Sequence, residues 1–331
     1  MLSVGCGTSL ERSQPRTSSR TGTTYYVSPS GSDSNAGTSP DAPWRTIRRV
    51  NDARLAAGDR VLFAGGARFA GTTLIPDTSG TDSAPIVFAS YGGRNATIVD
   101  GVWFVQNHVT LEHLNLEGPL FGGSGIHGPS DYVTVNHVSI ALPAGNHDLG
   151  LYANGEHWLV ENSSITDAGL SGMLLNGSDY TISGNTITNT GLDRAAPFNN
   201  HGIYLDASSS TISDNTIQNF ASSGISVRYR DSTITDNTIG GGSLGIDFFQ
   251  TDAGSGVSRW AHNTITGTTR AGIYVSPAGS GGQTHESFAI ESNTVLPTSG
   301  VSMNLNPTTG SYTLSGNTCS RMAGSCPDRV G

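Results

Sequence analysis

Short stretches in which apolar and polar residues alternate recur along most of the chain, for example at residues 180–183 and 232–235. Alternation over a few residues predicts a β-strand with one buried face. Two other patterns return with these stretches in constant order. The first is Asn followed by Thr and then Ile, Val or Cys, and it occurs at Asn185, Asn215, Asn237, Asn263, Asn293 and Asn317. The second is Gly followed by an aliphatic residue, and it occurs at Gly125, Gly150, Gly172, Gly202, Gly224, Gly245, Gly272 and Gly300.

The interval between consecutive Asn residues of the first pattern is 22 to 30 residues. A repeat of that length with about three short strands is one coil of a parallel β-helix. Leucine-rich repeats have similar lengths, but their Leu-x-x-Leu-x-Leu framework is absent. The repeated Asn residues are expected to stack as an internal amide ladder at one turn. We therefore predict an all-β protein, a single-stranded right-handed parallel β-helix, with coils from about residue 76 to residue 318.

The N-terminal segment does not follow the repeat. Residues 24–27 are predicted to form a short strand, and residues 45–57 form the only helix that the sequence predicts. A short amphipathic helix here would cover the open end of the first coil. We expect an N-terminal cap over residues 24–75 and a C-terminal cap over residues 319–331, together making one β-helix domain over 24–331. Cys319 and Cys326 are close enough in sequence for a local disulfide in the second cap.

Composition and charge exclude several classes of function. All 17 basic residues are Arg, so a lysine base or a Schiff base is excluded. The net charge is −9 and there is no basic run, so we expect no nucleic-acid partner. No segment approaches the roughly 18 to 20 apolar residues of a transmembrane span. We also expect the protein to be a monomer. The acidic balance still allows a polyanionic substrate, because a local cluster of Arg can bind one.

Residues 1–23 are predicted to form a flexible tether rich in Ser, Thr, Arg and Gly. Within it, Cys6 follows Leu2-Ser3-Val4-Gly5, which is similar to a lipoprotein cleavage site except that Ser3 stands where Leu is usual. Lipid attachment through Cys6 and an ordinary N-terminus are the two alternatives. We expect a secreted or extracytoplasmic protein, which the first alternative would hold at the cell surface.

The opening of the chain resembles the start of many secreted β-helix proteins of the polysaccharide lyase type, in the pectate-lyase-like superfamily. The shared features are Tyr-Tyr-Val-Ser-Pro-x-Gly-x-Asp from residue 25, Pro-Trp-Arg-Thr-Ile from residue 43 and Ala-Gly-Asp-x-Val from residue 57. Residues 84–101 continue the similarity, which covers nearly the whole chain from Thr24. The resemblance implies a β-helix with repeated coils that acts on carbohydrate.

The strand that follows each repeated Gly is where we look for chemistry. Successive side chains of a strand alternate in direction, so positions two and four after the Gly are expected to point outward. Stacked coils about 4.8 Å apart then turn these positions into two columns. The pairs are His127/Pro129, Tyr152/Asn154, Leu174/Asn176, Tyr204/Asp206, Ser226/Arg228, Asp247/Phe249, Tyr274/Ser276 and Ser302/Asn304. His201 lies just before the middle of this surface, at the end of the longest loop.

This set of side chains fits the chemistry of a uronic acid polymer. Removing the proton at C5 of a uronate requires a base, an acid for the leaving oxygen, and a group that neutralises the neighbouring carboxylate. We predict that His201 and Tyr204 supply the acid and the base and that Arg228 neutralises the carboxylate. The residues predicted to bind substrate are His147, Tyr152, Asp206, Arg230, Asp247 and Tyr274. For His147, capping a turn is an equal alternative.

Three other functions stay open at this stage. The central coils also resemble mannuronan C5-epimerases, but the Asp-Pro-His-Glu motif of those enzymes is absent. Hydrolysis is the runner-up, because Asp206 and Asp247 lie two coils apart, about 10 Å, and glycoside hydrolases separate two carboxylates by about 5 to 9.5 Å. The order His-Gly and then Arg-x-Arg also resembles polygalacturonases, although their paired upstream aspartates are missing. The third alternative is a β-helix that binds glycans without catalysis.

A metal site is not established by the sequence. Asp33, Asn35 and Asp41 in the N-terminal loop could offer oxygen ligands to Ca²⁺. They could equally form turns by bonding to their own backbone, and we favour that interpretation. No Cys or His spacing indicates zinc.

Overall fold

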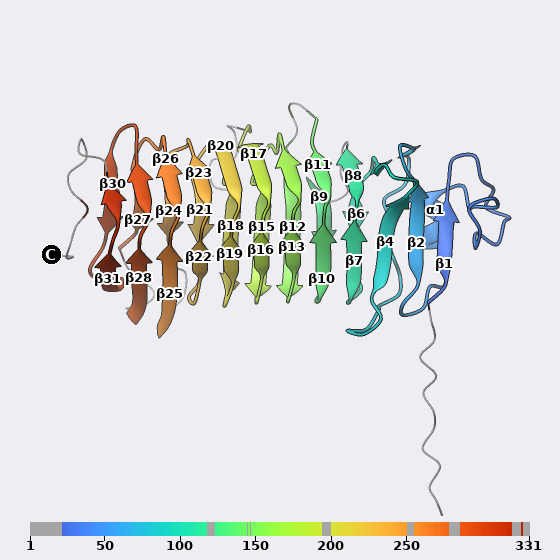
Figure 1. The fold of residues 1–331 in the computed structure, drawn as a ribbon, viewed down its shortest axis with the longest axis horizontal. Helices are drawn as coiled ribbons and strands as arrows, with labels where there is room; N and C mark the ends of the chain where they lie inside the picture. Colours follow the sequence, from blue (N-terminus) through green and yellow to red (C-terminus); the bar gives the residue numbers. More distant parts are fainter. Residues whose placement is uncertain are drawn as a thin grey trace, which may run out of the picture.

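The computed structural model describes residues 22–117, 123–143, 145, 147–193, 200–249, 255–277, 285–319 and 326. The strands wind around one long axis and form three long parallel sheets, which we call A, B and C (Figure 1). Each full coil passes through sheet A, then sheet B, then sheet C before it rises to the next coil. The predicted tether and Cys6 lie outside the described residues.

Sheet A has twelve strands, which pair in the order of the chain. They are β1 (Thr24–Val27), β2 (Arg60–Ala64), β4 (Ile86–Tyr91), β7 (Val109–Glu112), β10 (Val133–Asn136), β13 (Leu159–Glu161), β16 (Thr181–Ser183), β19 (Thr211–Ser213), β22 (Thr233–Thr235), β25 (Ser255–Ala261), β28 (His285–Glu291) and β31 (Gly310–Ser315).

Sheet B has eleven strands and follows sheet A in each coil. They are β3 (Arg68–Phe69), β5 (Ala96–Ile98), β8 (Leu114–Glu117), β11 (Ser139–Ala141), β14 (Ser164–Thr166), β17 (Thr186–Thr190), β20 (Thr216–Phe220), β23 (Thr238–Gly240), β26 (Thr264–Thr266), β29 (Thr294–Leu296) and β32 (Thr318–Cys319).

Sheet C has nine strands and carries the two predicted outward columns. They are β6 (Val102–Trp103), β9 (Ser124–Gly128), β12 (Leu149–Glu156), β15 (Met173–Ser178), β18 (Ile203–Ser208), β21 (Ser223–Val227), β24 (Leu244–Phe248), β27 (Ala271–Val275) and β30 (Val301–Leu305). The predicted fold of a single-stranded parallel β-helix is confirmed.

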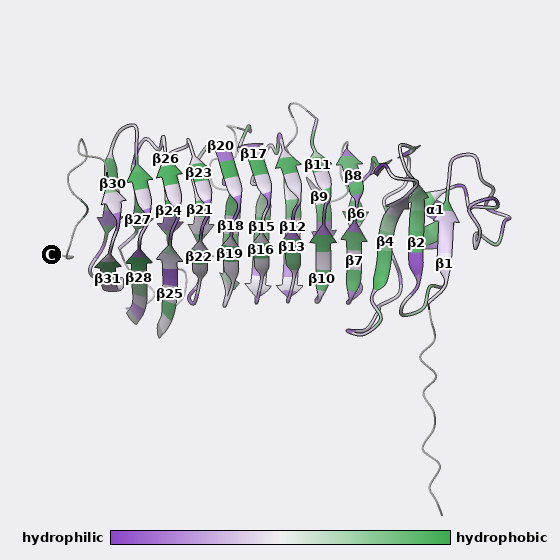
Figure 2. Ribbon diagram, in the orientation of Figure 1, coloured by the Kyte–Doolittle hydropathy of each residue, from purple (hydrophilic) through white to green (hydrophobic). Residues whose placement is uncertain are grey.

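The core lies inside the coils and is built from aliphatic residues that repeat at the same strand position. In sheet B, for example, Ile187, Ile217, Ile239 and Ile265 are in register and fully buried. Figure 2 shows the same alternation as hydrophobic bands that recur from strand to strand. Because each buried residue sits above its equivalent in the next coil, the core is continuous along the axis and each coil depends on its neighbours.

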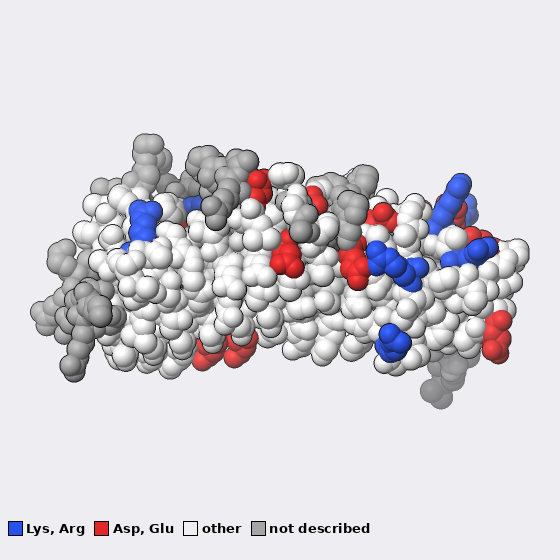
Figure 3. All heavy atoms as spheres, turned by 90° about the horizontal axis from the view of Figure 1, so that it is seen from above, with Lys and Arg blue, Asp and Glu red and all other residues white. Residues whose placement is uncertain are grey.

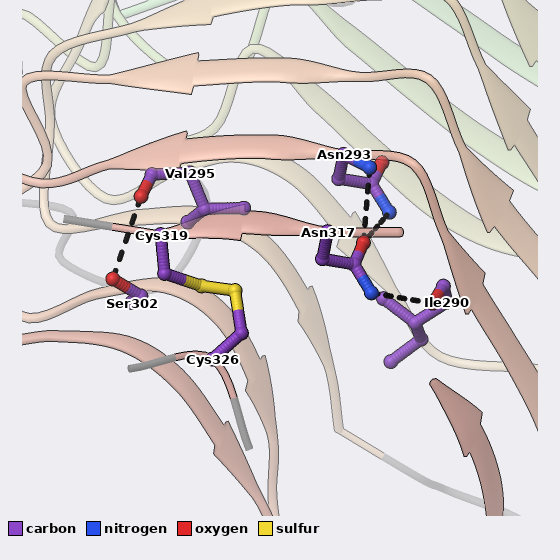
Figure 4. Close-up of a disulfide and its surroundings, with 7 residues drawn as sticks. All are labelled: Ile290, Asn293, Val295, Ser302, Asn317, Cys319 and Cys326. Carbon is purple, nitrogen blue, oxygen red and sulfur yellow. Dashed lines mark hydrogen bonds between the residues drawn. A yellow bond between two sulfur atoms is a disulfide. The ribbon is translucent and has the colours of Figure 1, made fainter. Parts of the chain in front are cut away.

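The predicted amide ladder is confirmed at the turn between sheets A and B. Asn185, Asn215, Asn237, Asn263 and Asn293 are each at most 1% exposed. Each donates from Nδ2 to the Oδ1 of the Asn in the next coil at 2.9 to 3.0 Å, and Asn293 donates to Asn317 in the same way (Figure 4). The backbone N–H of each Asn donates to that same Oδ1. The ladder therefore satisfies buried polar groups that no strand pairing reaches.

The repeated Gly stands at the corner where the chain passes from sheet B to sheet C. A Cβ added at Gly202 would lie 2.3 Å from Cγ2 of Ile217, and one at Gly224 would lie 2.4 Å from Cγ2 of Ile239. Any larger residue would therefore collide with the core of sheet B. The same close approach occurs in every coil from Gly150 to Gly272, and it explains why Gly returns there before the aliphatic residue.

The last coil departs from the predicted register. Tyr274 pairs with Asn304, so Gly272 is aligned with Ser302 and not with Gly300. Gly300 has a φ of 80° and lies in the turn before β30. Gly300 therefore belongs to the turn and not to the corner. The predicted pair Ser302/Asn304 is wrong by two positions, because Asn304 and not Ser302 lies in the first column.

The predicted short helix lies at the N-terminal end of the β-helix (Figure 1). The helix α1 (Ile47–Asn51) begins after Thr46, whose side chain accepts from the N–H of Arg49, and it buries Ile47 and Val50. It is shorter than the predicted 45–57, because the side chain of Asp59 accepts N–H bonds from Ala56 and Thr23 and holds the following residues in a turn.

At the other end, the predicted disulfide between Cys319 and Cys326 is confirmed, with a Cα–Cα distance of 5.3 Å (Figure 4). The bond joins Cys326 to the last residue of β32, the last strand of sheet B.

The outer surface is mostly uncharged. Figure 3 shows one face on which acidic side chains are scattered and several arginines gather toward the N-terminal end. Only 13% of the residues are charged, so Ser, Thr and Asn dominate the exposed strand positions. No helix among the described residues is long and apolar enough to cross a membrane.

Candidate active site on sheet C

The first predicted column runs along the outside of sheet C. Register places its members side by side in the order Trp103, His127, Tyr152, Leu174, Tyr204, Ser226, Asp247, Tyr274 and Asn304. Near its N-terminal end three rings contact one another, with centroid distances of 6.0 Å for Trp103–His127 and 4.8 Å for His127–Tyr152. Trp103 was not predicted, although Gly101 precedes it by two residues as the repeated Gly does in the later coils, because Gly101 was not recognised as a member of the repeat.

Tyr204 and Arg228 form the central contact of the surface. The Nε of Arg228 donates to the hydroxyl of Tyr204 at 2.9 Å, and its Cζ lies 4.8 Å from the centre of that ring. The same Cζ lies 5.0 Å from the ring of Phe249 in the following coil. The guanidinium is thus held between two aromatic rings, with a hydrogen bond that fixes its orientation. Tyr204, Arg228 and Phe249 are each partly exposed.

His201 adjoins this pair but is not open to solvent. Its ring centroid is 5.2 Å from that of Tyr204, and only 5% of the residue is exposed. Its backbone N–H donates to the hydroxyl of Ser171 in the preceding coil. The prediction that His201 lies in an open groove is therefore wrong. The reason is its place directly before the corner Gly202, where the chain bends and neighbouring coils enclose it.

Asp247 is also enclosed, although its register is that of an outward position. It is fully buried, and its Oδ2 accepts from the hydroxyl of Ser226 at 2.9 Å. The rings of Phe249 and Tyr274, which flank it, contact each other at 5.4 Å. Burial raises the pKa of Asp247 to about 6, and the hydroxyl of Ser223 and the charge of Arg228 oppose that rise. The buried carboxyl of Asp247 therefore holds a proton at mildly acidic pH.

This pKa predicts a pH dependence of stability. Because the folded-state pKa of about 6 exceeds the ordinary 3.8, the native state binds the proton more tightly than the unfolded chain does. The resulting stability is present below the ordinary pKa and is lost as pH rises through about 6. We expect the unfolding free energy of the wild type, relative to Asp247→Asn, to be about 2 kcal/mol higher at about pH 4 than at about pH 7. Urea titrations at the two pH values measure it, and a pH-independent difference would contradict it.

Asp206 follows Tyr204 by two residues and belongs to the second column. Register places it beside Asn176, with Asn154 one coil further. It is half-buried, and this burial raises the pKa of its carboxyl while the charge of Arg228 opposes the rise. Asp206 is thus close enough to Arg228 to be coupled to it electrostatically.

Two further predicted residues, Tyr152 and His147, lie away from the central contact between Tyr204 and Arg228. Tyr152 lies two coils before Tyr204, and its hydroxyl accepts from the side chain of Asn176 at 3.1 Å. His147 is exposed, and its Nδ1 lies 2.7 Å from a carboxylate oxygen of Asp193. The hydrogen bond to Asp193 raises the pKa of His147. This contact links the loop that contains His147 to the loop that contains Asp193. It supports the alternative that His147 stabilises a turn.

Arg230 lies apart from Tyr204 and Arg228, because the chain turns away from sheet C after β21. It lies beyond the end of β21, at the turn toward sheet A, where its charge acts on the buried carboxyl of Glu286. Burial raises the pKa of Glu286, and Arg230 is one of the groups that oppose the rise. Arg230 was predicted to bind substrate because it follows Arg228 closely in sequence, but the turn places it near Glu286.

Tyr274 lies at the C-terminal end of the cluster and has a cation of its own. The Cζ of Arg270 lies 4.7 Å from the centre of the Tyr274 ring. Sequence reasoning missed both Arg270 and Phe249. Phe249 stood in the second column, but its contact with Arg228 depends on side chains of different coils. Arg270 lies two residues before the corner Gly272, whereas alternation marks as outward only the positions two and four after that Gly.

No cluster of three or more potential metal ligands from His, Cys, Asp and Glu occurs in the part of the chain that the structure describes. In the N-terminal loop, the carboxylate of Asp33 accepts from the backbone N–H groups of Arg45 and Thr46 and from the hydroxyl of Thr46. The side chain of Asn35 donates to the carbonyl of Pro43. These bonds favour the turn-forming interpretation of this loop.

Comparison with known proteins supports the fold. The family model described as "Right handed beta helix region" matches residues 124–289 and again 201–326. Among curated proteins, the chain is similar to a lacto-N-biosidase of Bifidobacterium longum subsp. longum, with 48% identity over 80 residues. That match covers 23% of this chain and 5% of the relative, so the chain spans only a small part of the relative's length.

Two solved structures share the fold over most of the chain. The GH136 lacto-N-biosidase from Eubacterium ramulus has a TM-score of 0.64 and 15% identity, covering 89% of this chain and 67% of that one. An alginate lyase from Paenibacillus sp. has a TM-score of 0.57 and 15% identity, covering 82% of this chain and 97% of that one. At such identities the likeness concerns the fold alone.

Proposed function

The chain belongs to the family of right-handed β-helix proteins, and we propose that it is an enzyme acting on an extended polysaccharide that contains uronic acids. The observation that carries this proposal is the contact between Tyr204 and Arg228 in the middle of sheet C. A polysaccharide lying along the axis would pass over both side chains. The fold likeness to an alginate lyase agrees with this substrate class.

We propose β-elimination as the reaction. A base removes the C5 proton of a uronate, and the electron pair moves toward C4 as the C4–O bond to the neighbouring sugar breaks. An acid then protonates the leaving oxygen, so the products are a new chain end and an unsaturated uronate. Arg228 would neutralise the uronate carboxylate while negative charge develops beside C5. Tyr204, which is partly exposed, would exchange the protons with the sugar, since the chain has no lysine. His201 is buried but has its ring centroid 5.2 Å from that of Tyr204, so it would act on the reaction through Tyr204.

Hydrolysis is a second candidate, which a specific observation favours. Asp247, with its pKa raised to about 6, has the property expected of a general acid. Asp206 would be the second carboxyl, but it lies two coils away, about 10 Å along the axis, and in the other column. This separation exceeds the about 5 to 9.5 Å seen in glycoside hydrolases unless the two side chains turn toward each other. The lacto-N-biosidases among the similar proteins agree with this candidate. The full burial of Asp247 opposes it, because a general acid must reach the glycosidic oxygen.

A secreted or extracytoplasmic location belongs to the same proposal. The disulfide between Cys319 and Cys326 fits an oxidising compartment. Attachment through Cys6 would add a surface anchor, and the substrate would then be an extracellular glycan.

Incubation with alginate, pectate, glucuronan, glycosaminoglycans and neutral β-glycans tests the proposed function. We expect products that absorb in the ultraviolet, because elimination leaves a double bond conjugated with the carboxylate. New reducing ends without that absorbance would indicate hydrolysis, and altered sugar configuration without cleavage would indicate epimerisation. Binding without conversion would indicate a glycan-binding protein and would overturn the proposal of an enzyme, as would no interaction with any polymer.

A further inference from the structure

A second arginine and tyrosine pair, Arg270 and Tyr274, lies on sheet C two coils beyond Arg228 and three coils beyond Tyr204. Arg270 directly precedes β27, and its guanidinium lies over the ring of Tyr274 at 4.7 Å. The strands β21, β24 and β27 pair in that order, so one coil separates the coil of Arg228 from that of Arg270. The second pair repeats the chemistry of the first, a guanidinium held over a phenol ring.

The two pairs form one continuous cluster. Arg228 contacts the ring of Phe249 at 5.0 Å, and Phe249 contacts the ring of Tyr274 at 5.4 Å. Beneath these rings lies the buried Asp247, whose carboxyl feels the charges of both arginines. Aromatic rings and guanidinium groups therefore follow one another along the axis, with no aliphatic residue between them in this part of the described surface.

The charge of Arg270 is available to a ligand. Arg270 is exposed, and no carboxylate of the described residues lies within ion-pair distance of it. By contrast, Arg259 on sheet A is paired with Glu291 at 3.4 Å. Asp247 interacts with Arg270 electrostatically, but its carboxyl is fully buried and forms no ion pair with the exposed guanidinium among the described contacts. A guanidinium fixed over an aromatic ring and lacking an acidic partner suits a carboxylate of the substrate.

We propose that Arg270 and Tyr274 form a second carboxylate-binding subsite, so that the substrate carries carboxylates on two sugars that are two residues apart along the chain. One sugar of an extended polysaccharide advances by about the height of one coil, about 4.8 Å. Arg228 would bind the first carboxylate and Arg270 the second. The preferred class is then a polyuronate or a polymer with a uronate at every second sugar, and not one with isolated uronates. This inference rests on the proposed function.

Binding of defined oligosaccharides by calorimetry tests the subsite. The ligands are di-, tri- and tetrasaccharides of mannuronate and of galacturonate, and the same compounds with their carboxyl groups reduced to alcohols. All proteins carry Tyr204→Phe to prevent turnover. We expect Arg270→Gln to weaken binding of at least one acidic trisaccharide and its tetrasaccharide by about 10- to 100-fold, as expected for the loss of a charge-assisted bond. Binding of disaccharides and of reduced compounds should not change.

Two variants provide the controls. Arg259→Gln removes the same charge from sheet A and should leave all affinities unchanged. Arg270→Lys keeps the charge and should restore part of the affinity. Equal binding by Arg270→Gln and its parent would overturn the subsite, even if the wild type converts polyuronates. Wild-type protein that binds acidic trisaccharides through Arg270 but converts none would leave the subsite standing and overturn the proposed reaction. No binding of any acidic compound would overturn both.

Discussion

Replacing Tyr204 with Phe is expected to lower the turnover of a polyuronate by about two to four orders of magnitude, the usual effect of losing a catalytic acid or base. The substitution removes only the hydroxyl that accepts from Nε of Arg228 at 2.9 Å. The ring remains to pack against His201 and Arg228, so the unfolding temperature should change little. Initial rates from ultraviolet absorbance, measured together with thermal unfolding, provide the test.

The matched control for this variant is Tyr152→Phe. Tyr152 occupies the same column two coils earlier, and its hydroxyl bonds to Asn176 and not to an arginine. This change should cost activity far less than Tyr204→Phe. Equal losses in the two variants would mean that a hydroxyl anywhere in the column contributes to binding. Full activity of Tyr204→Phe would move the active site elsewhere.

His201→Ala and Arg228→Ala extend the same test. Both should nearly abolish turnover of polyuronates if they act as proposed. Arg228→Ala should spare activity on uncharged glycans, if the protein has such activity. Because His201 is buried, its replacement also removes packing, and its rate must be compared at a temperature where the variant is fully folded. Full activity in both Tyr204→Phe and His201→Ala would direct attention to His147.

Replacing Asn237 with Ala is expected to lower the free energy of unfolding by about 3 to 5 kcal/mol, with little direct effect on the chemistry of sheet C. Its Nδ2 donates to the carbonyls of Ile212 and Thr235 and to Oδ1 of Asn263, at 2.9 to 3.0 Å. Its Oδ1 accepts from the backbone and the side chain of Asn215, both at 3.0 Å. Alanine would leave these partners buried without bonds, which costs more than the bonds themselves contribute.

Urea denaturation followed by circular dichroism measures this loss, and Gln218→Ala serves as its control. Gln218 is exposed on β20 and lies outside the ladder. Its replacement should change the unfolding free energy by less than about 0.5 kcal/mol. Since coils stabilise their neighbours, a break at Asn237 in the middle of the ladder could also split the transition into two steps. A midpoint for Asn237→Ala equal to that of Gln218→Ala would contradict the structural role of the ladder.

The candidate site could be predicted from the sequence as far as strand alternation reaches. Alternation is a property of the local backbone, so the column from Tyr152 through Tyr204 to Tyr274 followed from the spacing after each repeated Gly. Prediction from alternation failed at the residues that lie beyond the end of a strand. Arg230 lies beyond such an end and faces Glu286, and Gly300 serves a turn and not a corner. At these places the direction of a side chain depends on the turn and not on the count of residues.

The sequence by itself determined the coil, the amide ladder, the corner glycine and the disulfide. Each of these depends on a residue type that returns at a fixed place in the repeat or, for the disulfide, on two residues close in the chain. Only the tertiary structure decided that Asp247 and His201 are buried, and that Arg228 and Arg270 lie over rings of Tyr204 and Tyr274. The physical reason is that burial, and with it the pKa of a carboxyl such as that of Asp247, depends on large side chains from adjacent coils, whose reach no repeat pattern specifies.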